Sequence, residues 1–272
     1  MSEPADPPRR EVGAHIAFRV EDPTEFVLAI ETADGVPLVA ETFEVRHGGS
    51  PLATREERDE AGTRLRVFAA ATGTVEITYS AVAEGRARPL PATAIELVRA
   101  LRPSRYVPSD ALTDLARGEF PGLDGAALVR AVGAWVHERL EYRAEASAPT
   151  GGALETLDAG AGVCRDFAHV TAGLLRALDV PARLVSVYAP ELEPMDFHAV
   201  VEAWIEQRWV VVDSTRLAPR SGLLRVATGR DAADTAWATN TLADVELLSL
   251  EVEARAAAPL TPDDPEELVE LG

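Results

Sequence analysis

The sequence predicts an α+β protein in which a β-sandwich-like N-terminal region precedes a core of helices and antiparallel strands. Three observations support this prediction. Apolar residues alternate at period two over residues 15–80, they recur at helical spacing over residues 124–178, and three strand-like runs follow. With 272 residues, of which 47% are hydrophobic, the chain is long enough to bury a sizeable core.

The N-terminal region contains four runs in which every second residue is apolar, as in half-buried strands. Turn signals such as ADGVP and HGGSP separate these runs, so several short strands and a small β-sandwich are expected. The side chains predicted to share a buried face are Ile16, Phe18 and Val20 in HIAFRV, Phe26, Leu28 and Ile30 in EFVLAIE, Leu65, Val67 and Ala69 in TRLRVFA, and Val75, Ile77 and Tyr79 in TVEITYS.

Helical patterns begin after a proline-rich connector, EGRARPLPATAIELVRALRPSRYVPSD, which itself predicts one short helix around residues 95–101. The stretch DGAALVRAVGAWVHERLEY has Asp124 as a candidate N-cap, and GGALETLDAG is a shorter helix that stops at Gly160. A third helix covers CRDFAHVTAGLLRALDV and ends before Pro181. Apolar stripes on the first and third of these helices consist of Leu128, Val132, Trp135 and Val136, and of Phe167, Val170, Leu174, Leu175 and Leu178.

Three strands are predicted next, over RLVSVYA, HAVVEAWI and WVVVDST, and after a glycine-punctuated loop VELLSLEVEA is a last strand. The domain organisation predicted from these elements is a polar N-terminal tail over residues 1–11, a β-rich domain over 12–83, a connector over 84–108, a core over 109–256 and an acidic C-terminal tail with little to bury over 257–272.

Composition narrows the classes of function. The formal charge of −19 argues against a nucleic-acid partner, because binding a phosphate backbone needs clustered positive charge. All 26 basic residues are arginine. No apolar run is long enough for a membrane span, and the polar start MSEPADPPRRE does not resemble a signal peptide, so a cytoplasmic protein without a membrane partner is expected.

Cys164 is the only cysteine in the chain, and it stands at the predicted start of the helix over CRDFAHV. A thiol at this position lies over the positive end of the helix dipole and near unpaired backbone N–H groups, which favour thiolate over thiol. The backbone N–H of Cys164 is also a natural first donor to an oxyanion, whereas the sequence does not place a second donor. The position suits a nucleophile.

His198 opens the strand HAVVEAWI, Asp213 closes WVVVDST, and the short connection between them predicts an antiparallel hairpin. If Trp204 faces Gln207, His198 and Asp213 lie directly opposite each other on one face. A two-residue shift would make them diagonal neighbours on the same face. In both registers Asp213 is able to accept a hydrogen bond from one imidazole nitrogen, which leaves the other nitrogen for the thiol of Cys164.

Each of these residues also has a purely structural interpretation. Cys164 could fill a core, His198 could be an ordinary half-buried histidine, and Asp213 could form a turn with Ser214 and Thr215. The order of nucleophile, acid–base group and orienting carboxylate on a helix start and two strands is harder to explain without chemistry.

A metal site is not expected. Cys164, His169 and His198 lack a fourth zinc ligand at ordinary spacing, and no acidic cluster has the spacing of a calcium-binding loop. Arg165 and Asp166 are expected to fix the start of the helix at Cys164, and His137 is expected to have a structural role. Asp196 is expected to be solvated, with the alternative that it points inward and raises the pKa of His198.

The segments GVCRDFAHVTAGLLRALDVPARLVSVY and FHAVVEAWIEQRWVVVDST closely resemble the bacterial transglutaminase-like proteins. In that family a papain-like core carries a Cys–His–Asp triad, and motif-by-motif matching places the nucleophile on Cys164, the histidine on His198 and the aspartate on Asp213. The stretches RPSRYVPSD and GRDAADTAW are similar to family signatures that flank the core, so the resemblance extends over roughly residues 12–255. It implies that the helix with the cysteine packs on an antiparallel sheet with the histidine and the aspartate.

The resemblance implies a cysteine enzyme that forms a thioester acyl-enzyme and needs no cofactor. Hydrolysis of a peptide-type amide in a peptide or protein substrate is favoured, because the acidic composition and the missing calcium motif give no support to cross-linking. Calcium-independent acyl transfer from protein glutamine is the alternative, and a non-catalytic scaffold is a third. Exposed strand edges in the β-rich region offer a surface for association into a homo-oligomer.

Overall fold

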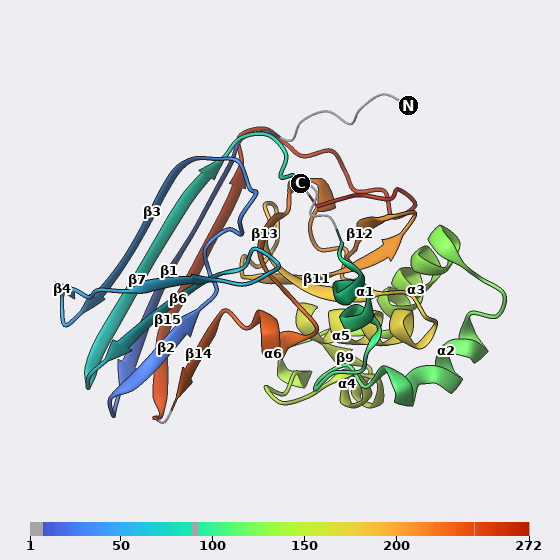
Figure 1. The fold of residues 1–272 in the computed structure, drawn as a ribbon, viewed down its shortest axis with the longest axis horizontal. Coiled ribbons are helices and arrows are strands. Elements are labelled where there is room, and N and C mark those ends of the chain that lie inside the picture. The colour runs from blue at the N-terminus through green and yellow to red at the C-terminus, as the bar shows by residue number, and fades with distance from the viewer. Residues whose placement is uncertain (1–7, 89–91, 242, 272) are drawn as a thin grey trace.

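A computed structural model of the chain describes residues 8–88, 92–241 and 243–271. Residues 1–7 of the predicted N-terminal tail and 89–91 of the predicted connector lie outside the described residues. The α+β class is confirmed: two sheets that contain the N-terminal strands form a β unit, and a third sheet lies against the helices (Figure 1). Among the described residues, none of the helices has the length and apolarity needed to cross a bilayer.

The β unit consists of a five-stranded sheet in the order β15-β1-β7-β3-β4 and a four-stranded sheet in the order β14-β2-β6-β5. Side chains from both sheets meet in one buried core, in which Ile16, Phe26 and Ile77 are almost fully covered. The strands are β1 (Arg10–Val20), β2 (Thr24–Leu28), β3 (Leu38–His47), β4 (Ser50–Pro51), β5 (Arg55–Arg58), β6 (Arg64–Ala70), β7 (Gly73–Ala83), β14 (Ala238–Thr241) and β15 (Val245–Ala256).

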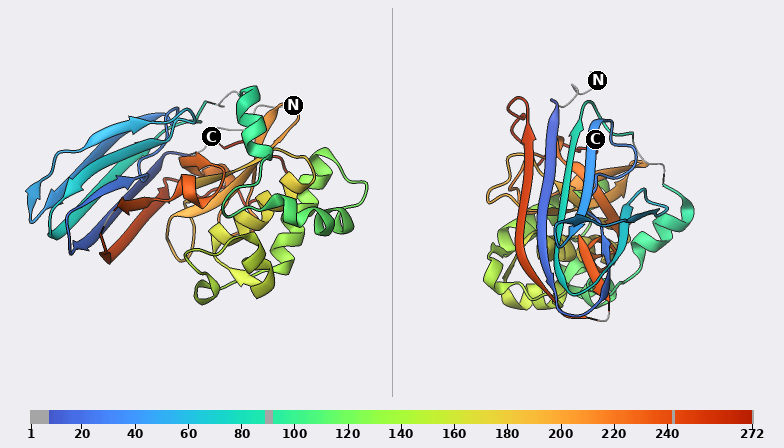
Figure 2. Two further views of the ribbon diagram at one scale, coloured as in Figure 1. Left: turned by 60° about the horizontal axis from the view of Figure 1, so that its bottom comes forward. Right: turned by 90° about the vertical axis from the view of Figure 1, so that its left-hand side faces the viewer.

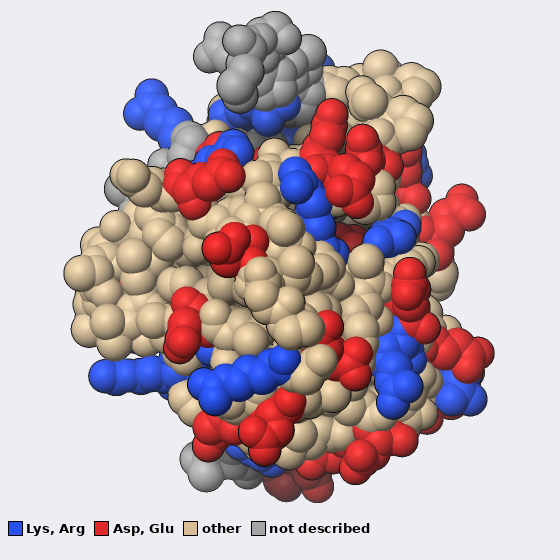
Figure 3. All heavy atoms as spheres, turned by 90° about the vertical axis from the view of Figure 1, so that its right-hand side faces the viewer, with Lys and Arg blue, Asp and Glu red and all other residues tan. Residues whose placement is uncertain are grey.

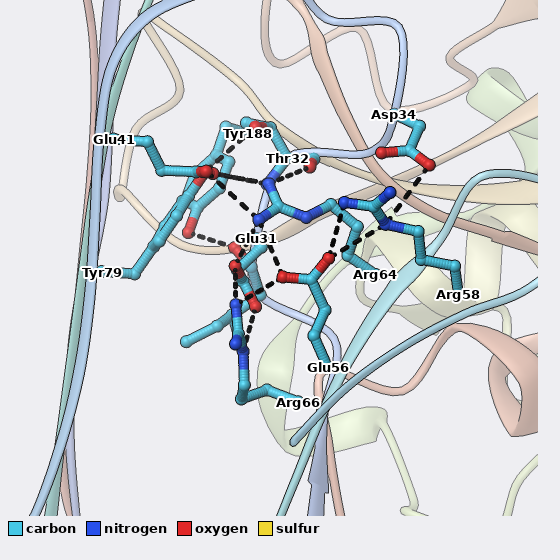
Figure 4. A network of polar contacts seen from close by, with 11 residues as sticks. Glu31, Thr32, Asp34, Glu41, Glu56, Arg58, Arg64, Arg66, Tyr79 and Tyr188 are labelled. Atoms are coloured by element: carbon cyan, nitrogen blue, oxygen red, sulfur yellow. Dashed lines mark hydrogen bonds and ion pairs between the residues drawn. The ribbon is translucent and has the colours of Figure 1, made fainter. Parts of the chain in front are cut away.

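The inward face predicted for β6 is wrong at Ala69, which is exposed, whereas Phe68 and Ala70 lie in the core. The reason is that Arg64 and Arg66, on the same side as Phe68, point inward although charged residues usually face solvent. Both guanidinium groups bind the buried carboxylate of Glu31, with nitrogen–oxygen distances of 2.8 and 2.6 Å. Figure 4 shows these ion pairs within a larger polar network of the β unit.

The last long strand belongs to the β unit, although the sequence prediction grouped it with the core. β15 pairs antiparallel with β1 from Arg10↔Ala256 to Val20↔Val245, and the right-hand view of Figure 2 shows the two strands side by side. Burial explains this pairing, because Val252 and Ala254 on β15 enter the core of the β unit.

The third sheet has the antiparallel order β12-β11-β10-β13, and helix α5 packs across one face of it. Its strand β13 lies in a segment that was predicted to be a loop. The sheet consists of β10 (Ala182–Tyr188), β11 (His198–Ile205), β12 (Arg208–Val212) and β13 (Leu224–Gly229). The helices are α1 (Ala94–Leu101), α2 (Thr113–Glu119), α3 (Gly125–Arg139), α4 (Ala153–Ala159), α5 (Cys164–Ala177) and α6 (Ala232–Thr235). Two short strands, β8 (Glu141–Tyr142) and β9 (Ala161–Gly162), pair in parallel, and 3₁₀ turns cover Ser109–Leu112, Ala144–Ala146 and Arg220–Gly222.

The expectation that the C-terminal tail buries little is wrong, because Leu260 and Leu271 are buried. The backbone N–H of Val211 donates to the carbonyl of Val269 at 2.7 Å, so the tail covers the outer edge of β12. On the helical face drawn in Figure 3, arginine side chains lie among acidic side chains rather than in one continuous basic patch.

Candidate active site

Polar contacts hold the first turn of α5, where Cys164 is the first helical residue. The Asp166 carboxylate accepts a hydrogen bond from the backbone N–H of Val163 at 2.9 Å. Arg165 binds Asp166 at 3.1 Å and Ser147 at 2.7 Å, which ties the helix start to the preceding loop. As predicted, Arg165 and Asp166 therefore fix the place where the thiol emerges.

Gly162 is required by a close approach to this helix start. A Cβ atom at Gly162 would meet the Cβ of Asp166 at 2.6 Å. We expect Gly162→Ala to lower the free energy of unfolding by about 1–3 kcal/mol, measured by urea denaturation, and to disturb Cys164. The matched control is Gly118→Ala in α2, which meets nothing within 4 Å and should stabilise slightly. Equal stability of the two variants would contradict this account of the helix start.

The hairpin between β11 and β12 has a different register from the predicted one. Trp204 pairs with Trp209 rather than with Gln207, so the prediction is wrong by two residues. Glu206 and Gln207 form a two-residue turn with φ angles of 51° and 61°, as a type I′ turn requires. The tight turn matches the twist of the strands, which favours it over the longer connection.

In the observed register His198 and Asp213 are diagonal neighbours, and their side chains still meet. His198 Nε2 lies 2.8 Å from Asp213 Oδ2, and both residues are buried. The other carboxylate oxygen accepts hydrogen bonds from the backbone N–H and the hydroxyl of Thr215, at 2.9 and 2.7 Å. Burial opposes the charge of Asp213, but His198 and Thr215 hold the pKa of its carboxyl below the usual range.

Charge also favours the imidazolium form of His198. Burial alone would lower the pKa of His198, but the Asp213 carboxylate outweighs it, and with a smaller contribution from Cys164 the pKa is raised to about 10. Nε2 of His198 is hydrogen-bonded to Asp213, whereas Nδ1 has no hydrogen-bond partner at ordinary distance among the described residues. The thiol of Cys164 interacts with the ring, so Nδ1 is the nitrogen available to it. The sulfur also lies 4.0 Å from the Phe197 carbonyl oxygen.

The β unit supports the segment that carries His198. The Phe197 ring stacks on Trp237 with centroids 5.8 Å apart, and Trp237 stacks on Phe18 of β1 at 6.1 Å. Tyr188 of β10 donates a hydrogen bond to the Ile30 carbonyl at 2.7 Å. Aromatic packing thus joins the β unit to the residue next to His198.

Other residues weighed in the sequence lie apart from this group. His169 is fully buried against the Tyr106 ring, accepts the Ala232 N–H at 3.2 Å, and burial lowers its pKa to about 4. His137 Nδ1 lies 3.0 Å from the Ser214 carbonyl oxygen. Within the described parts of the chain, no group of three or more His, Cys, Asp or Glu side chains could hold a metal ion.

Two residues of the site were missed by sequence reasoning. Thr215 was considered only as part of a turn, although an Asp-x-Thr pattern at a strand end often folds back on the carboxylate. Tyr142 interacts with Cys164 but follows the helix over residues 125–139, and nothing in its neighbourhood distinguishes it in the sequence.

A cysteine at a helix start, packed on an antiparallel sheet with a bonded histidine–aspartate pair, is the papain-like arrangement expected from the sequence. The model of the transglutaminase-like superfamily matches residues 115–214, a span that contains Cys164, His198 and Asp213. The structure is similar to that of a candidate cysteine protease from Cytophaga hutchinsonii, with a TM-score of 0.88 and 30% identity over 97% of this chain and 96% of that one. The chain belongs to the bacterial transglutaminase-like family.

An uncharacterized protein of Mycobacterium leprae (strain TN) is 29% identical over 116 residues. That match covers 40% of this chain and 42% of the relative. The chain therefore matches less than half of the length of this relative.

Proposed function

We propose that the protein is a cysteine enzyme that hydrolyses a peptide-type amide through a thioester on Cys164. The observation that carries this proposal is the buried His198, whose Nε2 binds Asp213 while Nδ1 is left for the thiol. A structural role alone does not require a buried histidine to keep one nitrogen without an ordinary partner beside a cysteine. The similarity to a candidate cysteine protease supports hydrolysis over transfer.

The reaction begins from a Cys164 thiolate and a His198 imidazolium. The sulfur attacks the amide carbonyl carbon, a C–S bond forms, and the backbone N–H of Cys164 binds the resulting oxyanion. The C–N bond then breaks as His198 gives its proton to the leaving amine, which yields the thioester. Water attacks the thioester while His198 accepts its proton, the C–S bond breaks, and the acid product leaves.

Asp213 has a positioning and electrostatic role in this scheme. It holds the ring of His198 in one orientation and stabilises the imidazolium without taking its proton. Thr215 in turn fixes the carboxylate through its backbone N–H and its hydroxyl. An amine in place of water would make the same acyl-enzyme a transferase, and the mass of the product distinguishes the two outcomes.

The test of the proposal is the rate at which iodoacetamide alkylates Cys164 as a function of pH, followed by intact mass. A single cysteine makes the mass change unambiguous. We expect fast alkylation that persists well below pH 8, and a rate about 100-fold lower at pH 6 in His198→Gln, because an unpaired thiol is mostly protonated there. Glutamine can still donate a hydrogen bond to Asp213, which protects the fold.

The matched control is His15→Gln on β1, where the side chain is exposed, and its alkylation profile should equal that of the wild type. Slow alkylation in the wild type, with the pH dependence of an ordinary thiol, would overturn the proposal and favour a non-catalytic scaffold.

A further inference from the structure

The position of Tyr142 is determined by a short parallel strand pair beside the nucleophile. Tyr142 of β8 is paired with Gly162 of β9, and the backbone N–H of Arg143 donates to the Gly162 carbonyl at 2.9 Å. Helix α5 begins two residues after Gly162, at Cys164. This register places Tyr142 next to the segment that leads into the first turn of α5.

The side chain of Tyr142 lies over that turn. Its ring packs against Phe167, which is one helical turn beyond Cys164, with ring centroids 6.0 Å apart. Its hydroxyl lies close enough to Cys164 for the backbone N–H and the thiol of that residue both to influence the pKa of the phenol. The residue is nevertheless 41% exposed, so a substrate that approaches the sulfur also meets the phenol.

The phenol remains a hydrogen-bond donor at neutral pH. Partial burial, followed by the electrostatic influence of Cys164, raises the pKa of Tyr142 well above the ordinary value of a phenol. A protonated hydroxyl beside a helix-start N–H is the type of donor pair that stabilises an oxyanion.

We propose that the Tyr142 hydroxyl is the second hydrogen-bond donor to the oxyanion that forms when Cys164 attacks a carbonyl, beside the backbone N–H of Cys164. The inference rests on the proposed function and adds a catalytic residue to it. A carbonyl oxygen that binds the N–H of Cys164 therefore arrives close to the phenol oxygen. The hydroxyl therefore turns toward the arriving oxygen, and its exposure leaves room for this movement.

Two reactions of the same sulfur separate this role from others. Acylation by p-nitrophenyl acetate passes through a tetrahedral oxyanion, whereas alkylation by iodoacetamide does not. We expect Tyr142→Phe to lower the acylation rate by about 100-fold and to leave the alkylation rate within about twofold. Phenylalanine keeps the ring contact with Phe167, so the fold is not at stake. The matched control is Tyr106→Phe, which removes a hydroxyl from the ring stacked on His169 and should change neither rate.

Every other outcome would overturn the inference. Faster acylation and alkylation in Tyr142→Phe would mean that the hydroxyl only covers the thiol, equal losses of both rates would mean a structural role, and unchanged rates would mean no role. If the wild type is alkylated rapidly but never acylated, the proposed function itself fails, and the inference fails with it. If the wild type is acylated and Tyr142→Phe is acylated equally fast, the inference alone fails.

Discussion

Exchange of Asp213 for asparagine should lower the rate of Cys164 acylation near neutral pH by about 10³- to 10⁴-fold while the protein stays folded. The amide oxygen can still accept the hydrogen bonds from Thr215, which hold the side chain in place. The amide N–H₂ group, however, faces His198 Nε2 and donates to it. The ring proton then resides on Nδ1, so the nitrogen beside Cys164 can no longer accept a proton, and the carboxylate that stabilised the imidazolium is gone.

The measurement is the release of one equivalent of p-nitrophenolate per Cys164 from p-nitrophenyl acetate, together with the far-ultraviolet circular dichroism of each variant. Asp196→Asn is the matched control. The charge of Asp196 acts on His198, two residues further on, but the side chain is exposed and its hydrogen bond goes to the adjacent Phe197 N–H. Its loss should therefore change the rate by no more than about threefold. Full activity in Asp213→Asn would remove Asp213 from the proposed machinery.

The second large effect concerns Glu202 on β11, the strand that begins with His198. The carboxylate of Glu202 is almost completely buried and binds Arg183 at 2.8 Å and Arg225 at 2.6 Å. Removing its charge by Glu202→Gln leaves the buried Arg225 without this counterion and leaves Arg183 with Glu96 alone. We expect the free energy of unfolding to fall by about 3–5 kcal/mol, measured by urea denaturation.

The charge-matched control is Glu246→Gln, which breaks an exposed ion pair with Arg19 and should cost less than about 1 kcal/mol. The dependence of the free energy of unfolding on pH provides an independent check. Burial alone would raise the pKa of Glu202, but Arg225 and Arg183 hold it at about 2. The stabilisation is therefore complete above the ordinary pKa of about 4.5 and is lost as the pH falls towards 2. A loss below 1 kcal/mol in Glu202→Gln would show that the buried pairs contribute little.

Local patterns in the sequence predicted most of the elements because those elements follow simple periodicities. The helix that begins at Cys164, the strand that begins at His198 and the alternation in β1 and β7 are examples. The predicted hairpin register is wrong by two residues, but a two-residue shift keeps the same side chains on each face of a strand. His198 and Asp213 therefore share a face in both the predicted and the observed register. An error of one residue would have placed His198 and Asp213 on opposite faces.

Features that depend on distant partners could not be predicted in this way. Arg64 and Arg66 face inward because carboxylates from outside β6 bind them, and no pattern within β6 reveals those partners, which are Glu31, Glu41 and Glu56. Similarly, the burial of Glu202 depends on Arg183 from β10 and Arg225 from β13. Tyr142 reaches Cys164 through a two-residue parallel pair, which is too short to have a periodicity.

The pairing of β15 with β1 has a topological consequence for the whole protein. The chain leaves the β unit after β7, builds the helices and the third sheet, and returns to the β unit through β14 and β15. The unit that carries Cys164, His198 and Asp213 is therefore inserted between β7 and β14 of the β unit. Because the C-terminal tail returns to β12 after β15, three chain crossings join the two units. A single flexible hinge cannot separate two units connected in this way, so the Phe197–Trp237 contact next to His198 is maintained by covalent connectivity as well as by packing.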